Sequence, residues 1–217
     1  MSHITLVRHG QANTEARDEA SYDKLSPLGH VQAEWLGAHL RGSRAHHTRV
    51  YAGTLTRHIE TAASAGFTES VTRDSRLNEM EYFALATCLE EQKGLPIPRA
   101  REGFVDHLPQ VYAAWEAGEI AGPPESWRDF ESRVASALAE IAAGEGPAIV
   151  FTSGGVIAMA MRLALELDTL GMARITLGIM NSSMTRLYPI GGHLSPVLFN
   201  AVPHLEDRER HHAQTHL

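Results

Sequence analysis

Short apolar runs alternate with amphipathic segments along most of the sequence. The runs ITLV from Ile4, RVYAG from Arg49 and PAIVFT from Pro147 are typical of short buried strands. Between them, residues 26–42, 54–66 and 127–144 place apolar side chains at helical spacing. The segments MTRLYPI and SPVLFNAV, separated by GGH, are typical of a β-hairpin. This alternation predicts an α/β fold, a three-layer α/β/α sandwich with a mostly parallel central sheet.

Several helix ends can be predicted from single residues. Ser26 suits the capping position of the helix over residues 26–42, Pro27 its first turn and Gly42 its end. Thr54 is expected to open the helix over residues 54–66. Ser153 follows the strand AIVFT and is expected to cap a helix that starts near Gly155.

The chain is expected to form a single domain over residues 1–217, since this length suits one hydrophobic core. A long stretch without a clear strand predicts a helical insertion at about residues 82–127. The sequence from about residue 206 is polar and predicts a frayed C-terminal tail. No repeat or low-complexity tract interrupts this organisation.

Charge and cysteine content narrow the classes of function. The formal net charge is -7, which argues against nucleic acid or an anionic membrane as a partner. The one cysteine, Cys88, allows no internal disulfide and fits a reducing compartment. Neither a secretory leader nor an apolar run long enough to span a bilayer is evident. We therefore expect a soluble cytoplasmic protein.

Polar side chains follow the predicted strands where ligands bind in open α/β sheets, at the carboxyl ends. Arg8 and His9 end the first strand, and Arg57 lies just after the second. Glu79 follows a third candidate strand, and Ser153 with Gly154 follows the fourth. Each has an ordinary explanation alone: a turn, a solvated arginine, a loop carboxylate or a helix cap. Together they offer a nucleophile, two anion-binding guanidinium groups, a carboxyl group and a helix N-terminus.

Most of these residues lie within a series of sequence blocks that follow one another in a fixed order. The blocks are LVRHG, LSPLGHVQAEWLGAHL, YAGTLTRHIETA, RLNEME, NSSMTRL and FNAVPHLE. In this order and spacing the chain resembles the histidine phosphatase superfamily, which includes the cofactor-dependent phosphoglycerate mutases. The resemblance runs from Ile4 to about Leu205, nearly the whole chain.

The resemblance implies a role for each of these residues. His9 resembles the nucleophile that becomes phosphohistidine, and Arg8 and Arg57 resemble the arginines that bind the phosphoryl group. Glu79 resembles the general acid and base, with Glu81 as the second choice. The implied ligands are a small phosphorylated substrate and inorganic phosphate, bound without a metal or cofactor, in a chain that could form a homodimer.

Two positions depart from the family's pattern. Ser153 stands where members usually carry a second histidine that donates to the phosphoryl oxygens, so reduced activity is expected. The asparagine usual five residues after the Arg-His-Gly motif is replaced by Glu15. Asn13 could substitute for it, and Gln11, Asn13 and Glu81 are candidate substrate contacts.

Three functions stay open at this point. A phosphatase that hydrolyses phosphate monoesters is favoured, because the insertion carries few basic residues to hold the carboxylate of a mutase substrate. A phosphoglycerate mutase-type phosphoryl transferase is the second. A phosphate-binding regulatory protein with weakened catalysis is the third, and Ser153 is its main support. The thirteen histidines, including His46-His47 and His211-His212, are interpreted as solvated side chains rather than metal ligands.

Overall fold

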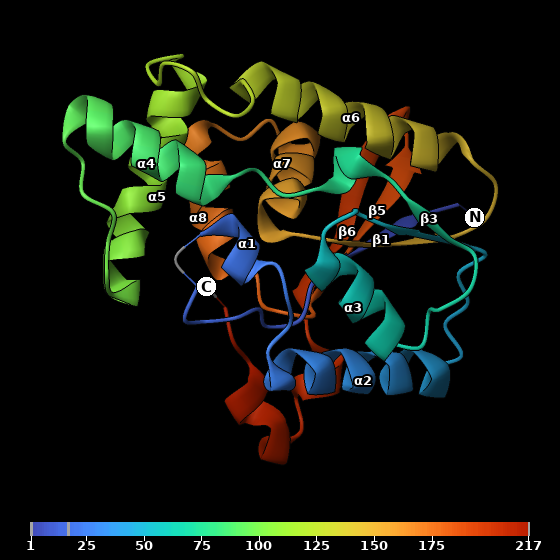
Figure 1. Ribbon diagram of the computed structural model, residues 1–217. Helices are drawn as coiled ribbons and strands as arrows, with labels where there is room; N and C mark the ends of the chain where they lie inside the picture. The colour runs from blue at the N-terminus through green and yellow to red at the C-terminus, as the bar shows by residue number, and fades with distance from the viewer. Residues whose placement is uncertain (1, 17, 217) are drawn as a thin grey trace.

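The computed structural model describes residues 2–16 and 18–216, and within them six strands form one sheet (Figure 1). The strands are β1 (Ile4–Arg8), β2 (Arg49–Ala52), β3 (Val71–Arg73), β4 (Ala148–Thr152), β5 (Met184–Ile190) and β6 (His193–Ala201). Their order is β3-β2-β4-β1-β5-β6. The first four in this order are parallel, and β5 is antiparallel to both of its neighbours. The prediction of a mostly parallel sheet is confirmed.

Helices cover both faces of this sheet (Figure 1). On one face lie α2 (Pro27–Gly42) and α3 (Thr56–Ser64), and on the other α6 (Trp127–Ala143) and α7 (Gly154–Leu165). Successive strand residues point to opposite faces. Val7 of β1 therefore packs with Leu36 and Leu40 of α2, while Leu6 belongs to the core cluster that includes Val134 of α6. This alternation produces the predicted three-layer sandwich.

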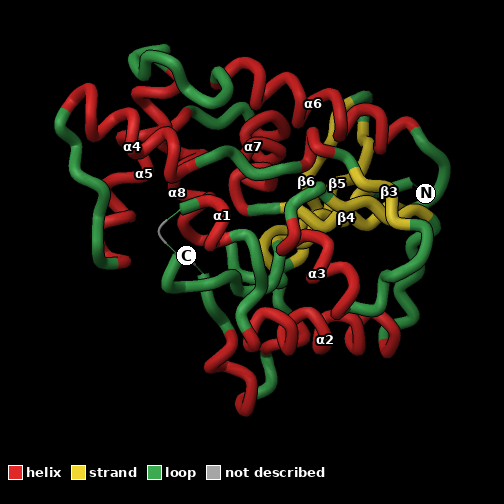
Figure 2. Tube along the Cα trace, in the orientation of Figure 1, coloured by secondary structure: helices red, strands yellow, loops and turns green. Residues whose placement is uncertain are grey.

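The remaining helices lie to one side of the sheet (Figure 2). They are α1 (Glu19–Tyr22), α4 (Tyr82–Lys93), α5 (Arg101–Glu116) and α8 (Thr169–Gly178). The proposed insertion over residues 82–127 contains α4, α5 and the loop that leads to α6. Helix α1 contacts α4, because Glu19 accepts a hydrogen bond from the Phe83 N–H at 2.8 Å and Tyr22 packs against the Phe83 ring.

The predicted starts of α2 and α3 have different outcomes. Ser26 caps α2 as expected, since its hydroxyl accepts the N–H of Gly29 at 3.1 Å. The prediction that Thr54 opens α3 is wrong, because α3 begins at Thr56. The carboxylate of Asp23, distant in sequence, accepts the N–H groups of Thr56 and Arg57 at 2.9 and 3.2 Å. A tertiary contact satisfies this helix end, and local sequence does not reveal it.

Of the two predictions for the C-terminal part of the chain, one is confirmed and one is wrong. The hairpin of β5 and β6 is confirmed, and Gly191 and Gly192 turn the chain at φ +61 and +87. The expectation of a frayed tail is wrong. Short 3₁₀ helices cover Pro203–Leu205 and Arg208–Ala213, and Ala213 is fully buried. The Gln32 side chain of α2 donates to the Ala213 carbonyl at 2.7 Å, which holds the tail against α2.

A third 3₁₀ helix, Ser75–Leu77, connects β3 to the loop that carries Glu79. None of the helices in the described part of the chain is long and apolar enough to cross a membrane.

Candidate active site

The ends of β1 and β4 bring the predicted site residues together. Arg8 pairs with Thr152 in the parallel register, so His9 and Ser153 leave adjacent strands at the same level. The His9 N–H donates to the Thr152 carbonyl at 2.8 Å, which fixes the two strand ends to each other. Arg57 reaches the same place from the first turn of α3 and is only 2% exposed. The site is therefore built on the central strands of the sheet and on the first turn of α3.

The hydrogen bonds of His9 define its tautomer. Its Nδ1 lies 2.7 Å from the carbonyl oxygen of Gly10, which can only accept a hydrogen bond, so Nδ1 carries the proton. Nε2 is then the lone-pair nitrogen, and it has no hydrogen-bond partner among residues 2–16 and 18–216. The Asn181 side chain and the Ser182 N–H both donate to the His9 carbonyl and hold its backbone. The ring therefore presents an unoccupied nucleophilic nitrogen.

Burial and charge keep this imidazole neutral. The His9 side chain is 2% exposed, and desolvation is the largest cause of a pKa well below the usual 6.5. The guanidinium groups of Arg57 and Arg8 lower the pKa of His9 further by repelling a second positive charge. A neutral imidazole at neutral pH is the form that can attack phosphorus.

The two arginines are anchored but retain unused donors. Arg8 donates one Nη1 bond to the Ile179 carbonyl, and Arg57 pairs with Asp23 at 3.0 Å. The Nε–H groups of both arginines are buried and find no partner within the described chain. Arg57 also lies over the ring of Tyr22, 5.0 Å from its centroid. Buried unpartnered N–H groups are costly, so this region is suited to an anion that would accept them.

Glu79 lies at the N-terminus of α7. One carboxylate oxygen accepts the Gly155 N–H at 2.9 Å, and the other accepts the Met80 N–H at 3.1 Å. A Cβ on Gly155 would lie 2.2 Å from a Glu79 oxygen, so glycine is required for this approach. Gly154 lies against Arg8, where a Cβ would be 3.6 Å from the guanidinium Nε.

The predicted cap at Ser153 is partly wrong. Ser153 is the N-cap residue of α7, and the helix starts at Gly154, but the Ser153 side chain makes no capping hydrogen bond. Its hydroxyl lies instead 2.6 Å from Nε2 of His58. Glu79 takes over the capping contact because its carboxylate already reaches the first turn.

His58 is the residue that sequence reasoning missed. It is fully buried, follows Arg57 on α3, and its ring centroid lies 5.8 Å from that of His9. Burial, followed by the Arg57 charge, lowers its pKa well below 6.5. The only sequence signal is an imidazole directly beside a predicted phosphate-binding arginine.

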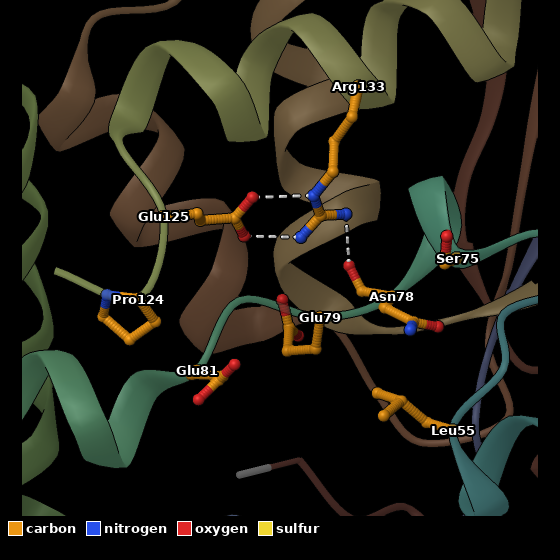
Figure 3. A pocket seen from close by; sticks show the side chains of 8 residues that line it. All are labelled: Leu55, Ser75, Asn78, Glu79, Glu81, Pro124, Glu125 and Arg133. Atoms are coloured by element: carbon orange, nitrogen blue, oxygen red, sulfur yellow. Dashed lines mark hydrogen bonds and ion pairs between the residues drawn. The ribbon is translucent and has the colours of Figure 1, made fainter.

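A cavity of about 270 Å³ adjoins this buried cluster (Figure 3). Its lining residues are Leu55, Ser75, Asn78, Glu79, Glu81, Pro124, Glu125 and Arg133. Arg133 makes two hydrogen bonds to the Glu125 carboxylate at 2.8 and 2.6 Å and one to the Asn78 carbonyl at 2.7 Å (Figure 3). Glu79 belongs to both regions and joins the cavity to the His9 cluster.

The three candidate substrate contacts lie in different places. Glu81 is exposed and lines the cavity. The Gln11 side chain accepts the Ser26 hydroxyl at 2.8 Å, and the Asn13 amide donates to the Ser21 carbonyl at 2.9 Å. These bonds hold the loop that leads to α1. Substrate contact by any of the three stays a prediction.

Across the described residues, no group of three His, Cys, Asp or Glu side chains is arranged to hold a metal ion. The tail histidines His211 and His212 each bond a backbone carbonyl at 2.9 Å.

Comparison with known proteins places the chain in a family. The family model described as the histidine phosphatase superfamily (branch 1) matches residues 4–202. The chain belongs to this superfamily. No curated protein sequence matches it significantly.

Solved structures share the fold. A mutant phosphoserine phosphatase from Entamoeba histolytica in complex with phosphoserine aligns with a TM-score of 0.70 at 19% identity, covering 94% of this chain and 100% of that one. The mycobacterial glucosyl-3-phosphoglycerate phosphatase with inorganic phosphate has a TM-score of 0.65 at 24% identity, covering 94% and 99%. YhfR of Bacillus stearothermophilus has a TM-score of 0.69 at 21% identity, covering 95% and 100%.

Proposed function

We propose that the protein hydrolyses phosphate monoesters through a phosphohistidine intermediate on His9. The observation that carries this proposal is the His9 tautomer: the Gly10 carbonyl holds the proton on Nδ1 and leaves the Nε2 lone pair unused. Arg8 and Arg57 flank it with buried N–H donors that lack partners within the described residues. These groups can bind the phosphoryl oxygens and stabilise the charge on them in the transition state.

In the first step, His9 Nε2 attacks phosphorus and the bond from phosphorus to the ester oxygen breaks. The protonated carboxyl group of Glu79 gives its proton to that oxygen, so a neutral alcohol leaves. The N–H groups of Gly155 and Met80 hold the carboxyl group in place. The enzyme is left with a phosphorylated His9 and an ionised Glu79.

In the second step, water attacks the phosphorylated His9. The Glu79 carboxylate takes one proton from the water, the new P–O bond forms, and the bond from phosphorus to Nε2 breaks. Inorganic phosphate leaves, and both residues return to their starting states. The reacting groups in this scheme are His9, Glu79, the phosphate monoester and one water molecule.

The relatives support a small phosphorylated substrate. Structures with this fold are named as phosphatases, and two of them contain phosphoserine and inorganic phosphate. The cavity beside Glu79 gives room for the part of a substrate beyond its phosphate group.

Trapping the intermediate tests the proposal. Brief incubation with a ³²P-labelled monoester, followed by denaturation in alkali, is expected to leave label on His9, stable to base and lost in acid. The label should decay with release of inorganic phosphate. Label on another residue, or no label during measurable turnover, would refute the mechanism. Transfer of the label to a phosphoglycerate in preference to water would instead show a mutase.

A further inference from the structure

His58 and Ser153 form an isolated pair of buried polar side chains beside the nucleophile. Both are 0% exposed, and His58 Nε2 lies 2.6 Å from Ser153 Oγ. The pair connects α3, which carries Arg57, to the N-cap of α7, whose first turn binds Glu79. The His58 ring is also close to the nucleophile, since its centroid lies 5.8 Å from that of His9.

The surroundings of the His58 ring indicate which group donates in this pair. Nδ1 is buried and has no partner among the described residues. An unpartnered N–H costs more than an unpartnered lone pair, so the proton is placed on Nε2. Nε2–H then donates to Ser153 Oγ, and the Ser153 hydroxyl proton is left without an acceptor. That proton can be donated to an anion beside His9.

The backbone is shaped to hold this ring. A Cβ on Gly53 would lie 2.2 Å from His58 Nδ1 and 2.7 Å from Asn78 Oδ1, so any larger residue at Gly53 would displace the ring. His58 also follows Arg57 directly on α3, and the same helix turn therefore positions both side chains.

We propose that His58 is a positioning residue that holds and polarises the Ser153 hydroxyl, which in turn donates to the transferring phosphoryl group. The family resemblance implies one histidine donor at position 153. In this chain, two residues from different elements would together supply that donor. The inference rests on the proposed function in one respect, since the anion is identified as the phosphoryl group of the substrate.

A double-mutant cycle measures the connection. His58→Leu removes the donor and keeps a similar volume, Ser153→Ala removes the hydroxyl, and both changes are also combined. Each single variant is expected to weaken binding of inorganic phosphate and vanadate and to lower kcat by about tenfold or more. In the Ser153→Ala background, His58→Leu should change either value less than about twofold, because its effect passes through the hydroxyl.

A conservative variant separates this role from packing. His58→Gln places an amide N–H near the position of Nε2 and is expected to keep phosphate affinity and kcat within about threefold of the wild type. Thermal unfolding of every variant reports stability independently. Equal losses for His58→Gln and His58→Leu, or an effect of His58→Leu that is unchanged in the Ser153→Ala background, would overturn the proposal.

The cycle is measured both as binding of inorganic phosphate and as turnover. Coupling in phosphate binding without any turnover of monoesters would refute the proposed function and support the pairing. Turnover through His9 without coupling would support the function and refute the pairing. If His58→Leu does not fold, His58→Gln is compared in the wild-type and Ser153→Ala backgrounds instead. Any effect of His58→Gln must then disappear in the Ser153→Ala background, and an effect that persists there would refute the pairing.

Discussion

The buried cluster around His9 and the adjoining cavity differ in how they use positive charge. In the cluster, Arg8 and Arg57 are almost fully buried, yet each keeps an Nε–H without a partner in the described structure. In the cavity, the Arg133 guanidinium donates hydrogen bonds to the Glu125 carboxylate and to the carbonyls of Arg76 and Asn78. An arginine in the first region is available to a ligand, whereas the arginine in the second stabilises the fold.

Under the proposed function, this difference separates phosphate binding from recognition of the rest of the substrate. The carboxylates of Glu79, Glu81 and Glu125 line the cavity, and they disfavour a second anionic group there. Glu79 lies at the boundary, where a leaving oxygen would be positioned between the two regions. The number of arginines near a site is therefore a poor guide to anion binding, and their remaining donors are a better one.

The largest expected effect is that of replacing the proposed nucleophile. His9→Ala should lower kcat by about 10⁴-fold or more, because the covalent path is removed and only binding and electrostatic stabilisation are left. Inorganic phosphate should still bind, since Arg8 and Arg57 are unchanged. Steady-state kinetics and phosphate titration measure the two. Near-normal turnover would contradict the mechanism.

The two regions can next be compared by matched arginine substitutions. Arg57→Ala should weaken phosphate and vanadate binding and lower kcat/KM by about 10²–10³-fold, because a buried donor to the anion is lost. Arg133→Ala should leave phosphate affinity unchanged and lower the free energy of unfolding by about 1–3 kcal/mol, because Glu125 loses its partner. Titration and chemical denaturation of both variants test this. Weakened phosphate binding in Arg133→Ala, together with normal binding in Arg57→Ala, would place anion binding in the cavity instead.

Sequence reasoning identified the features of the fold that local patterns determine. The parallel strands, α2 with its Ser26 cap and the C-terminal hairpin follow from apolar periodicity and turn residues. The start of α3 and the packed tail were missed because side chains distant in sequence, Asp23 and Gln32, satisfy their backbone groups. Contacts of this kind have no local signature.

The same limit applies to the site. Arg8, His9 and Arg57 could be placed together because parallel strands end at one edge of a sheet. The pairing of His58 with Ser153 joins residues 95 positions apart, and neither residue alone indicated it. Ser153 was predicted as a helix cap in the anion-binding set and was noted as a departure from the family's pattern, but no partner for its side chain was predicted. Its partner became visible once the fold brought α3 against the end of β4.

The proposed acid and base role at the boundary is tested by replacing two glutamates. Glu79→Gln should slow alkyl phosphates by about 10²-fold or more and p-nitrophenyl phosphate much less, because p-nitrophenolate leaves without a proton. Glu81→Gln, on the exposed side of the cavity, should change both by less than about threefold. Rates on the two substrates are compared for each variant. A larger selective loss in Glu81→Gln would assign the acid to Glu81.

A smaller effect is expected from moving Glu79 without removing it. In Gly155→Ala the new Cβ would meet a Glu79 oxygen at 2.2 Å and the Met80 side chain at 2.7 Å, so the carboxyl group must shift. In Gly154→Ala the nearest contact is an ordinary 3.6 Å, to Arg8. Turnover of alkyl phosphates should fall about tenfold or more in the first variant and little in the second. Equal losses would show that the Glu79 position is not critical.

The buried histidines of the chain and the buried carboxyl group of Glu19 should respond oppositely to acid. Of the described histidines, five have a lowered pKa, mainly through burial: His9, His47, His58, His107 and His204. The unfolded chain protonates these groups near pH 6.5 while the folded chain does not, so their contribution to stability is lost as the pH falls below that value. Burial raises the pKa of Glu19, beside Glu79 and Glu81, to about 7. As the pH falls from 7 toward the pKa of this group in the unfolded chain, the folded chain binds a proton first. Protonation of Glu19 therefore increases the free energy of unfolding over this range.

The combined effect of the five histidines exceeds that of Glu19, so the free energy of unfolding should fall as the pH is lowered from 6.5 to 5. His9→Gln removes one titrating group and should reduce this slope by up to about 1.4 kcal/mol per pH unit. Glu19→Gln should make the slope steeper, because it removes the opposing group. Chemical denaturation at a series of pH values measures all three proteins. An unchanged slope in His9→Gln would mean that His9 is protonated in the fold, and it would then need to lose a proton before it could attack phosphorus.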